Sequence, residues 1–217
     1  MTITVIDHPL AQSIITMLRD KRTGQIEFRK GLVRLGRLMG YEVAKSFPTR
    51  EVEVETPLGV RTSGVTMDMG DVVIIQILRA AMPMVEGLLK VFPMARMGVI
   101  SAKRREETHE RGSMEFEIEM NYVRIPRIQR DTTVMVVDPM LATGSTMIAA
   151  LNTVREKGEP RRMILINAIG TKQAIDRVLG RYPQADIYLA AIDPEINENG
   201  YIIPGLGDAG DRAYGEA

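Results

Sequence analysis

The chain alternates between two hydrophobic patterns, which predict helices and strands in turn. Apolar residues recur every three or four positions, as on one face of an α-helix, in residues 11–21, 25–46, 84–91, 147–154 and 172–179. Short apolar or alternating runs, which are typical of strands, occupy residues 50–59, 72–78, 97–102, 116–122, 134–137, 161–169 and 185–192. This order of elements favours an α/β fold with a doubly wound, mostly parallel sheet.

Two segments depart from the regular alternation. Residues 103–112 are charged and contain no apolar residue, which favours a mobile loop on a β-arm that spans residues 103–125. A solvated hairpin without chemistry is the alternative. Residues 197–215 are rich in glycine and loop-like, but the apolar residues within them argue against a disordered polar tail. We therefore expect an ordered loop that brings its backbone close to a ligand.

Composition limits the classes of protein that the chain can belong to. With 217 residues and no shift in composition, we expect a single domain over residues 1–217. Lysine plus arginine and aspartate plus glutamate both number 28, so no global basic field indicates nucleic acid or an anionic membrane. The absence of cysteine excludes disulfides, thiolate metal sites and a cysteine nucleophile. No apolar run approaches the roughly 18 residues of a membrane span, and we expect a cytoplasmic protein.

The most informative stretch is residues 134–146, which reads as strand, loop and helix. The loop from Ala142 to Thr146 is small and rich in hydroxyl groups, and the amides at the start of a helix together with its dipole favour a phosphate there. Asp138 lies at the carboxyl end of the strand, where open α/β sheets bind their ligands. The alternative is an ordinary helix with Thr143 or Ser145 as its N-cap.

Basic residues suggest two further sites. Arg79 directly follows the buried strand 72–78, so it is expected at the same sheet edge as Asp138, although an ordinary surface arginine is the alternative. On the helix of residues 25–46, Lys30 and Arg34 are four residues apart and share a polar face. This face is either simply solvated or forms a subunit contact or an effector-phosphate site, with Lys90 as a further candidate residue.

Four motifs resemble known sequences. Residues 136–146, Val-Val-Asp-Pro-Met-Leu-Ala-Thr-Gly-Ser-Thr, resemble the phosphoribosyl-pyrophosphate (PRPP) loop of type I phosphoribosyltransferases, and the Asp-Pro pair is similar to the uracil phosphoribosyltransferase family in particular. Residues 200–212, Gly-Tyr-Ile-Ile-Pro-Gly-Leu-Gly-Asp-Ala-Gly-Asp-Arg, resemble that family's uracil-binding hood, here residues 193–217. Residues 77–80 and 104–108 resemble its pyrophosphate loop and its second arginine loop.

The chain also departs from the family pattern at three positions. Ser145, Arg105 and Ala81 stand where the family usually has glycine, aspartate and glycine. A β-carbon at Ser145 could crowd the phosphate, but its hydroxyl adds a donor, so we expect binding to survive. The resemblance nevertheless covers the chain from about residue 8 to its end.

The resemblance implies transfer of the 5-phosphoribosyl group from PRPP to N1 of uracil, giving UMP and pyrophosphate. Mg²⁺ is the implied cofactor, held mainly by PRPP rather than by protein ligands. Catalytic roles are implied for Arg79, Arg104, Asp138 and Asp208. PRPP contacts are implied for these four and for Pro139, Met140, Leu141, Ala142, Thr143, Gly144, Ser145 and Thr146. Uracil is expected to meet mostly backbone groups at Ile202, Gly207, Asp208 and Ala209. Related enzymes also suggest a cis Leu78–Arg79 peptide.

Partners follow from the same resemblance. The family includes GTP-activated members, so GTP is a candidate effector for Lys30, Arg34 and Lys90, and a homodimer or homotetramer is expected. Two alternatives stay open: a regulator that binds RNA and nucleotide on a transferase fold, and a transferase for another base. Neutral net charge argues against the first, and the hood motif argues against the second.

Overall fold

The structure is a computed structural model, and it describes residues 1–105 and 114–216. Within these residues the main sheet has the strand order β1-β10-β9-β7-β4-β5-β6, and β8 pairs with β9. The strands are β1 (Ile3–Val5), β4 (Val72–Leu78), β5 (Arg96–Arg104), β6 (Ile118–Arg124), β7 (Thr133–Val137), β8 (Met140–Leu141), β9 (Arg162–Thr171) and β10 (Asp186–Asp193). All neighbouring pairs in this sheet are parallel except β5 and β6.

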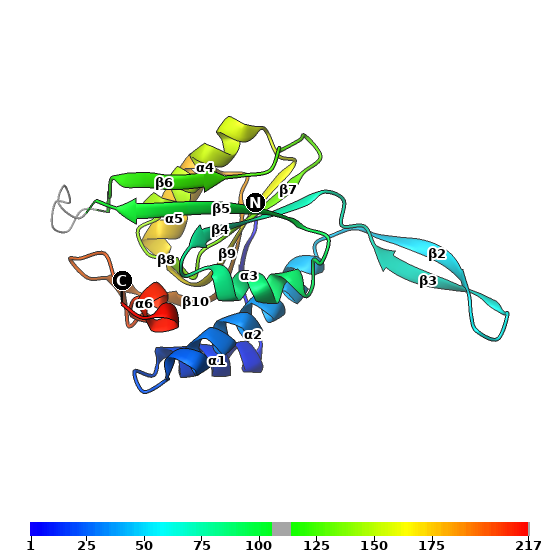
Figure 1. Cartoon of the computed structure of the whole chain (residues 1–217), viewed down its shortest axis with the longest axis horizontal. Helices are drawn as coiled ribbons and strands as arrows, with labels where there is room; N and C mark the ends of the chain where they lie inside the picture. The colour runs from blue at the N-terminus through cyan, green and yellow to red at the C-terminus, as the bar shows by residue number, and fades with distance from the viewer. Residues whose placement is uncertain (106–113, 217) are drawn as a thin grey trace.

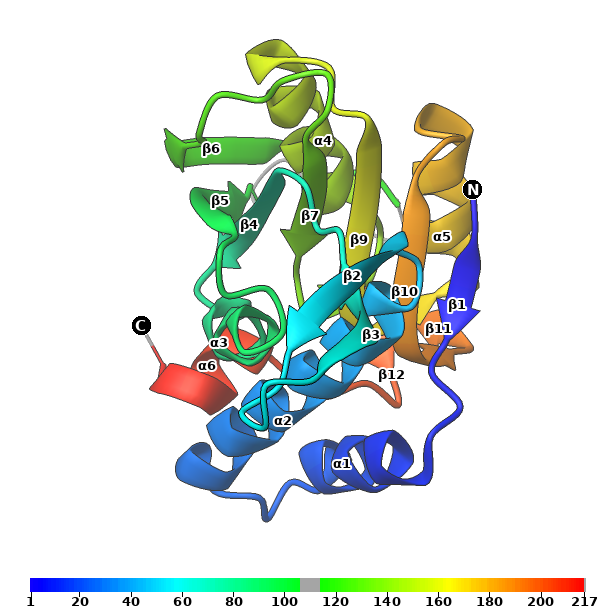
Figure 2. The same ribbon diagram turned by 90° about the vertical axis from the view of Figure 1, so that its right-hand side faces the viewer.

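Helices cover both faces of this sheet (Figures 1 and 2). One face carries α1 (Pro9–Arg19), α2 (Gln25–Ala44) and α3 (Met82–Leu89), and the other carries α4 (Ser145–Lys157) and α5 (Lys172–Arg181). Successive residues of β7 show the consequence: Met135 and Val137 join the core under α2, while Val134 and Val136 join the core under α4. A strand buried on both faces must be apolar throughout, which explains the uninterrupted apolar runs. The predicted doubly wound α/β fold is confirmed.

A β-hairpin projects away from the body (Figure 1). Its strands are β2 (Thr49–Glu55) and β3 (Arg61–Met67), which pair antiparallel. The predicted strand of residues 50–59 is β2, whereas β3 escaped prediction because its sequence, Arg-Thr-Ser-Gly-Val-Thr-Met, has no apolar alternation. Within the part of the chain that the structure describes, no helix is long and apolar enough to cross a membrane.

The two irregular segments have different outcomes. The alternating residues before and in β6 form the antiparallel edge strand of the main sheet. Most of the predicted mobile loop of residues 103–112 lies outside the described residues, which end at 105 and resume at 114. Residues 197–215 are more regular than the predicted loop, because they form β12 (Ile202–Ile203), which pairs with the preceding β11 (Glu195–Ile196), and the helix α6 (Ala209–Tyr214).

Close packing of two helices fixes the start of α3. A Cβ on Gly36 of α2 would lie 2.1 Å from the backbone oxygen of Met84, and one on Gly87 would lie 2.1 Å from the backbone oxygen of Val33. Only glycine at both positions lets the two backbones approach so closely. Because α3 begins three residues after Arg79, this crossing also fixes the loop that carries Arg79.

Candidate active site

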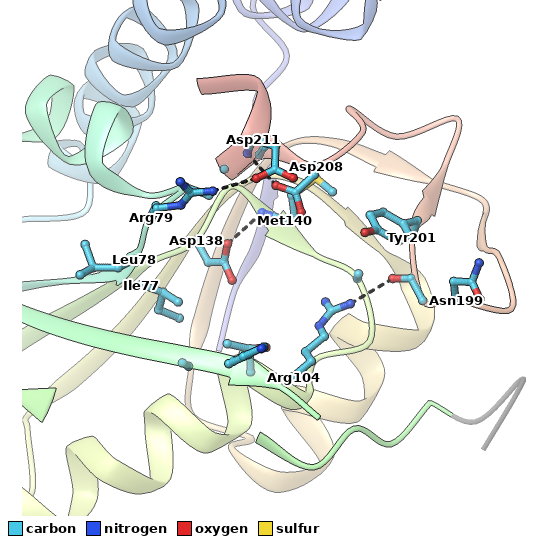
Figure 3. A pocket seen from close by; sticks show the side chains of 18 residues that line it. Ile77, Leu78, Arg79, Arg104, Asp138, Met140, Asn199, Tyr201, Asp208 and Asp211 are labelled. Carbon is cyan, nitrogen blue, oxygen red and sulfur yellow. Dashed lines mark hydrogen bonds and ion pairs between the residues drawn. The ribbon is translucent and has the colours of Figure 1, made fainter. Parts of the chain in front are cut away.

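The carboxyl ends of three neighbouring strands meet at one edge of the sheet. Arg79 follows β4, Arg104 ends β5, and Asp138 follows β7. A cavity of about 440 Å³ opens between them, and the C-terminal segment, residues 193–216, closes its far side with Asp208 and Ala209. Figure 3 shows Arg79 on one side of the cavity, Arg104 on the other, and Asp138 between them.

The structure brings together part of the predicted site. The predicted residues that line the cavity are Arg79, Arg104, Asp138, Met140, Ala142, Thr146, Asp208 and Ala209. The predicted residues outside its lining are Pro139, Leu141, Thr143, Gly144, Ser145, Ile202 and Gly207.

The turn between β7 and α4 begins the helix without a side-chain cap. Gly144 is the N-cap in a left-handed conformation, with φ of 82°, so neither Thr143 nor Ser145 caps α4 as the alternative interpretation expected. The first bond along the helix runs from the Ile148 N–H to the Gly144 carbonyl. The amides of Thr146 and Met147 therefore precede the helical ladder and have no acceptor within it.

Hydroxyl groups of this turn are used inside the protein. Thr143 and Ser145 are 0% and 6% exposed, and the Ser145 amide donates to the Thr143 hydroxyl at 3.3 Å. The Ser145 hydroxyl accepts a bond from the Phe116 amide at 3.1 Å. The Ser145 side chain does not line the cavity.

Arg79 reaches the cavity from an unusual backbone. The Leu78–Arg79 peptide bond is cis, as predicted. The Arg79 Nη2 donates to Asp211 Oδ1 at 2.7 Å and to the Gly215 carbonyl at 3.3 Å. Both partners of the ion pair are exposed, at 42% and 40% of their side-chain surface. The contact joins the end of β4 to α6 of the C-terminal segment.

Asp138 is a half-buried carboxyl group with an altered affinity for protons. Burial raises its pKa to about 6, and the charge of Asp208 acts in the same direction. The Met140 amide, which donates to Asp138 Oδ1 at 3.3 Å, and the charge of Arg104 oppose this shift. The buried Asn167 of β9 donates to the Asp138 carbonyl at 2.5 Å and fixes the backbone there.

Arg104 lies between an aromatic ring and a backbone carbonyl. Its guanidinium is 5.0 Å from the centroid of the Phe116 ring, within the range of a cation–π interaction. Its Nη1 also donates to the Gly200 carbonyl at 3.4 Å. Gly200 has φ of 76°, and a Cβ there would lie 2.8 Å from the Phe116 ring, so this close arrangement requires glycine.

The C-terminal segment is held in place by a buried ion pair. Arg19 of α1 makes two bonds to Asp193, at 2.5 Å and 2.8 Å, and Asp193 is 3% exposed. Asp193 also accepts the Gly205 amide at 2.9 Å, and Arg19 donates to the Gly205 carbonyl at 3.0 Å. Arg212 adds bonds to the carbonyls of Leu206 and of residues at the end of α1.

Asp208 caps α6 by accepting the Asp211 amide at 2.9 Å, so it has a structural role besides its predicted one.

Sequence analysis did not identify four polar residues that line the cavity, namely Lys103, Asn199, Tyr201 and Asp211. For Asp211, the only signal in the sequence was its position as the second aspartate of the Gly-Asp-Ala-Gly-Asp-Arg run. Its contact with Arg79 joins residues 132 positions apart, so no local pattern could indicate it.

A second cavity of about 760 Å³ lies between α2 and α3. Lys30 and Arg34, two residues of the predicted effector site, line it together with Arg29 and apolar side chains. Lys90, the third predicted residue, is exposed at the end of α3 and does not line this cavity. The four-residue spacing on α2 therefore correctly placed Lys30 and Arg34 on one surface, while Lys90 lies elsewhere.

The described residues hold no group of three or more histidine, cysteine, aspartate or glutamate side chains suited to a metal ion. Asp138 and Asp208 are nevertheless two carboxylates in one cavity, close enough for the charge of one to affect the pKa of the other. Mg²⁺ commonly binds through one or two carboxylates, several waters and the phosphates of a substrate. This donor set fits an ion that arrives with a phosphorylated ligand.

Comparison with known proteins decides the family. The family model described as uracil phosphoribosyltransferase matches residues 5–216. The chain belongs to the uracil phosphoribosyltransferase family. The chain is 52% identical over 214 residues to a uracil phosphoribosyltransferase of Pyrobaculum islandicum, covering 99% of both chains. It is 50% identical over 209 residues to one of Thermococcus gammatolerans, covering 96% of this chain and 91% of the relative.

Solved structures share the fold of this member of the uracil phosphoribosyltransferase family. A protein from Aquifex aeolicus superposes with a TM-score of 0.89 at 33% identity, covering 100% of this chain and 99% of that one. An adenine phosphoribosyltransferase from Trypanosoma brucei, solved with AMP, pyrophosphate and ribose-5-phosphate, has a TM-score of 0.55 at 13% identity, over 88% of this chain and 83% of that one. The second likeness shows the shared fold.

Proposed function

We propose that the protein transfers the 5-phosphoribosyl group of PRPP to N1 of uracil, giving UMP and pyrophosphate. The observation that carries this proposal is the convergence of Arg79, Arg104 and Asp138 with the C-terminal Asp208 around one cavity. Membership of the uracil phosphoribosyltransferase family supports the choice of uracil as the acceptor.

The reaction requires stabilisation of a leaving anion. The sugar carbon gains positive charge as pyrophosphate departs, so the protein must neutralise the anion and exclude water. Arg79 and Arg104 enter the cavity from opposite sides and are suited to bidentate contact with phosphate oxygens. To bind pyrophosphate, Arg79 shares or releases its exposed ion pair with Asp211, which costs little because such pairs are weak.

The 5′-phosphate binds at the turn before α4. The amides of Thr146 and Met147, the Thr146 side chain and the dipole of the helix offer donors and positive potential there. The Thr143 and Ser145 hydroxyls shape the turn from within rather than contacting the phosphate. Asp138 accepts the ribose hydroxyls, a role that requires its ionised form.

Uracil binds against the C-terminal segment, with residues 193–217 as the hood. Asp208 and Ala209 line the cavity from this segment, and we assign recognition of the donors and acceptors of the ring to backbone groups between Ile202 and Ala209, with Asp208 facing PRPP. Rigid backbone groups discriminate between bases because a wrong base leaves buried polar groups unpaired. The bonds of Arg19 and Asp193 to Gly205 support that rigidity.

Mg²⁺ is the proposed cofactor, and when bound it would add positive charge to the departing pyrophosphate. Asp138 and Asp208 are the carboxylates that would complete its coordination beside PRPP and water. We also propose GTP as an effector at the second cavity, where Lys30 and Arg34 offer charge for phosphates and apolar side chains offer a surface for a base. A homodimer or homotetramer is proposed as the assembly.

The function is tested by measuring product formation from PRPP and Mg²⁺ with uracil, cytosine, adenine, guanine and orotate in parallel. We expect UMP from uracil alone, and little product from the Asp138→Asn variant. Activity with a different base would keep the PRPP site and overturn the assignment of the hood. Absence of turnover with every base, with and without GTP, would contradict the proposal, and binding to its own leader RNA would then favour the regulator.

The effector proposal has its own test. Adding GTP should change kcat or the KM for PRPP, and the Arg34→Met variant should lose this response while keeping basal activity. Lys90→Met, outside the cavity, is the matched control. If Arg34→Met responded to GTP as the wild type does, GTP would not bind at this cavity.

A further inference from the structure

Helix α5 supports the phosphate-binding turn from behind. The Thr171 hydroxyl, at the start of this helix, donates to the Ala142 carbonyl at 2.8 Å. Gly144 packs so closely against the helix that a Cβ there would lie 3.3 Å from the backbone oxygen of Ala174. Arg177 lies one turn further along α5, on the side that faces this turn. The arrangement places a cation behind the turn and outside the cavity lining.

Arg177 joins two segments that are far apart in the sequence. Its Nη1 donates to the Thr143 carbonyl at 3.0 Å and to the Ser145 hydroxyl at 2.9 Å. The same nitrogen donates to the Met114 carbonyl, and Nη2 forms an ion pair with Glu115 at 3.3 Å. The Arg177 side chain is 26% exposed, and its bonds to Met114, Thr143 and Ser145 are partly buried, whereas Glu115 is 84% exposed. One guanidinium thus links the turn before α4 to the residues that precede β6.

Ser145 carries the connection onward to Phe116. Its hydroxyl accepts the Phe116 amide at 3.1 Å and donates to the Met114 carbonyl at 3.2 Å. Phe116 is 8% exposed, and its ring packs against both the Arg104 guanidinium and the close-lying Gly200. A buried ring fixed by its own backbone leaves the Arg104 guanidinium little freedom to turn away from the cavity.

We propose that Arg177 is a positioning residue for the transfer reaction. By holding Ser145 and Met114 together it fixes Phe116, and Phe116 holds Arg104 in the direction in which it meets the pyrophosphate group of PRPP. Arg177 itself touches neither substrate. This inference rests on the proposed function, because it explains what holds Arg104, which the proposed function uses to bind pyrophosphate.

Steady-state kinetics provides the first test. Arg177→Met removes every donor while keeping an unbranched side chain, and we expect the KM for PRPP to rise about tenfold because misplaced groups lose much of their contribution. The KM for uracil should change less than twofold. Arg177→Lys keeps the charge and should recover part of the loss. Arg181→Met, an exposed arginine on the same helix, is the matched control and should behave as the wild type.

A double-mutant cycle separates positioning from a general structural role. Calorimetry would measure Mg²⁺–pyrophosphate binding by the wild type, by Arg177→Met, by Arg104→Ala and by the double variant. If Arg177 acts through Arg104, its replacement should weaken binding about tenfold in the wild-type background and less than twofold in the Arg104→Ala background. Equal losses in both backgrounds would overturn the proposal.

Ser145→Ala guards the test against loss of folding in Arg177→Met. This variant removes one hydroxyl from a helical position, so we expect it to fold. Its affinity for Mg²⁺–pyrophosphate should fall about threefold, and this loss should shrink when Arg104 is also replaced by alanine. Wild-type affinity in Ser145→Ala would contradict the route through Phe116. Because pyrophosphate binding requires no turnover, these results are independent of whether the wild type forms UMP from uracil.

Discussion

At the scale of single residues, Asp138 combines two opposed demands. In the proposed reaction it must be charged to accept hydrogen bonds from the ribose hydroxyls, yet burial raises its pKa to about 6. The sequence could place this residue, because it directly follows a four-residue apolar strand and strand ends share one sheet edge. The sequence could not give its pKa, which depends on Arg104 and Asp208, residues brought near by the fold.

A first prediction concerns stability and pH. The folded-state pKa of Asp138 exceeds its ordinary value of 3.8, so ionisation costs stability as pH rises through about 6, and the cost is absent below about pH 4. Asp138→Asn, without the charge, should therefore be more stable than the wild type by about 2–3 kcal/mol at pH 8, with little difference at pH 4. Urea denaturation at both pH values measures this. An equal difference at both would contradict the shift.

Asp211 offers a second prediction at the residue scale. Its ion pair with Arg79 competes with pyrophosphate, and exposed pairs contribute up to about 1 kcal/mol, so Asp211→Asn should tighten PRPP binding by up to about fivefold. Titration calorimetry measures the affinity, with Glu42→Gln, which breaks an exposed pair on α2, as the control. Weaker PRPP binding in Asp211→Asn alone would show that the pair orients Arg79 instead.

At the scale of elements, hydrophobic periodicity was sufficient to predict a helix or strand where one or both of its faces are buried. The strand of residues 72–78 was predicted with its observed ends, because β4 is buried from both sides. The strand β3 was not predicted, since a projecting hairpin buries little and leaves no apolar pattern. The short elements β11, β12 and α6 were also missed, because contacts with distant parts of the chain hold them.

The C-terminal segment gives a third prediction. Arg19→Met should leave Asp193 buried without its cation, at a cost of about 3 kcal/mol in stability, and should loosen the loop at Gly205. The KM for uracil should then rise about fivefold or more, with the KM for PRPP nearly unchanged. Steady-state kinetics well below the melting temperature tests this. Arg22→Met, an exposed arginine beside the same helix, is the control, and an unchanged KM for uracil would separate this ion pair from base recognition.

At the scale of the whole molecule, the cavity depends on the parallel sheet. Three neighbouring parallel strands, β4, β5 and β7, deliver Arg79, Arg104 and Asp138 to one edge, and the C-terminal segment returns across the sheet to close it (Figure 3). The sequence predicted the parallel sheet and the shared edge. It could not predict the supporting contacts of Arg177, Phe116 and Asn167, because each joins residues about 30 or more positions apart.

The most direct test of the account is the kcat/KM for PRPP in UMP formation by the wild type and by Arg79→Ala. Arg79 stabilises the departing pyrophosphate in this account, so its removal should lower kcat/KM by about 100-fold. Arg130→Ala, an exposed arginine on the loop before β7, should retain wild-type values. A wild type that forms UMP while Arg79→Ala keeps the same kcat/KM would contradict the assignment of the reaction to this cavity.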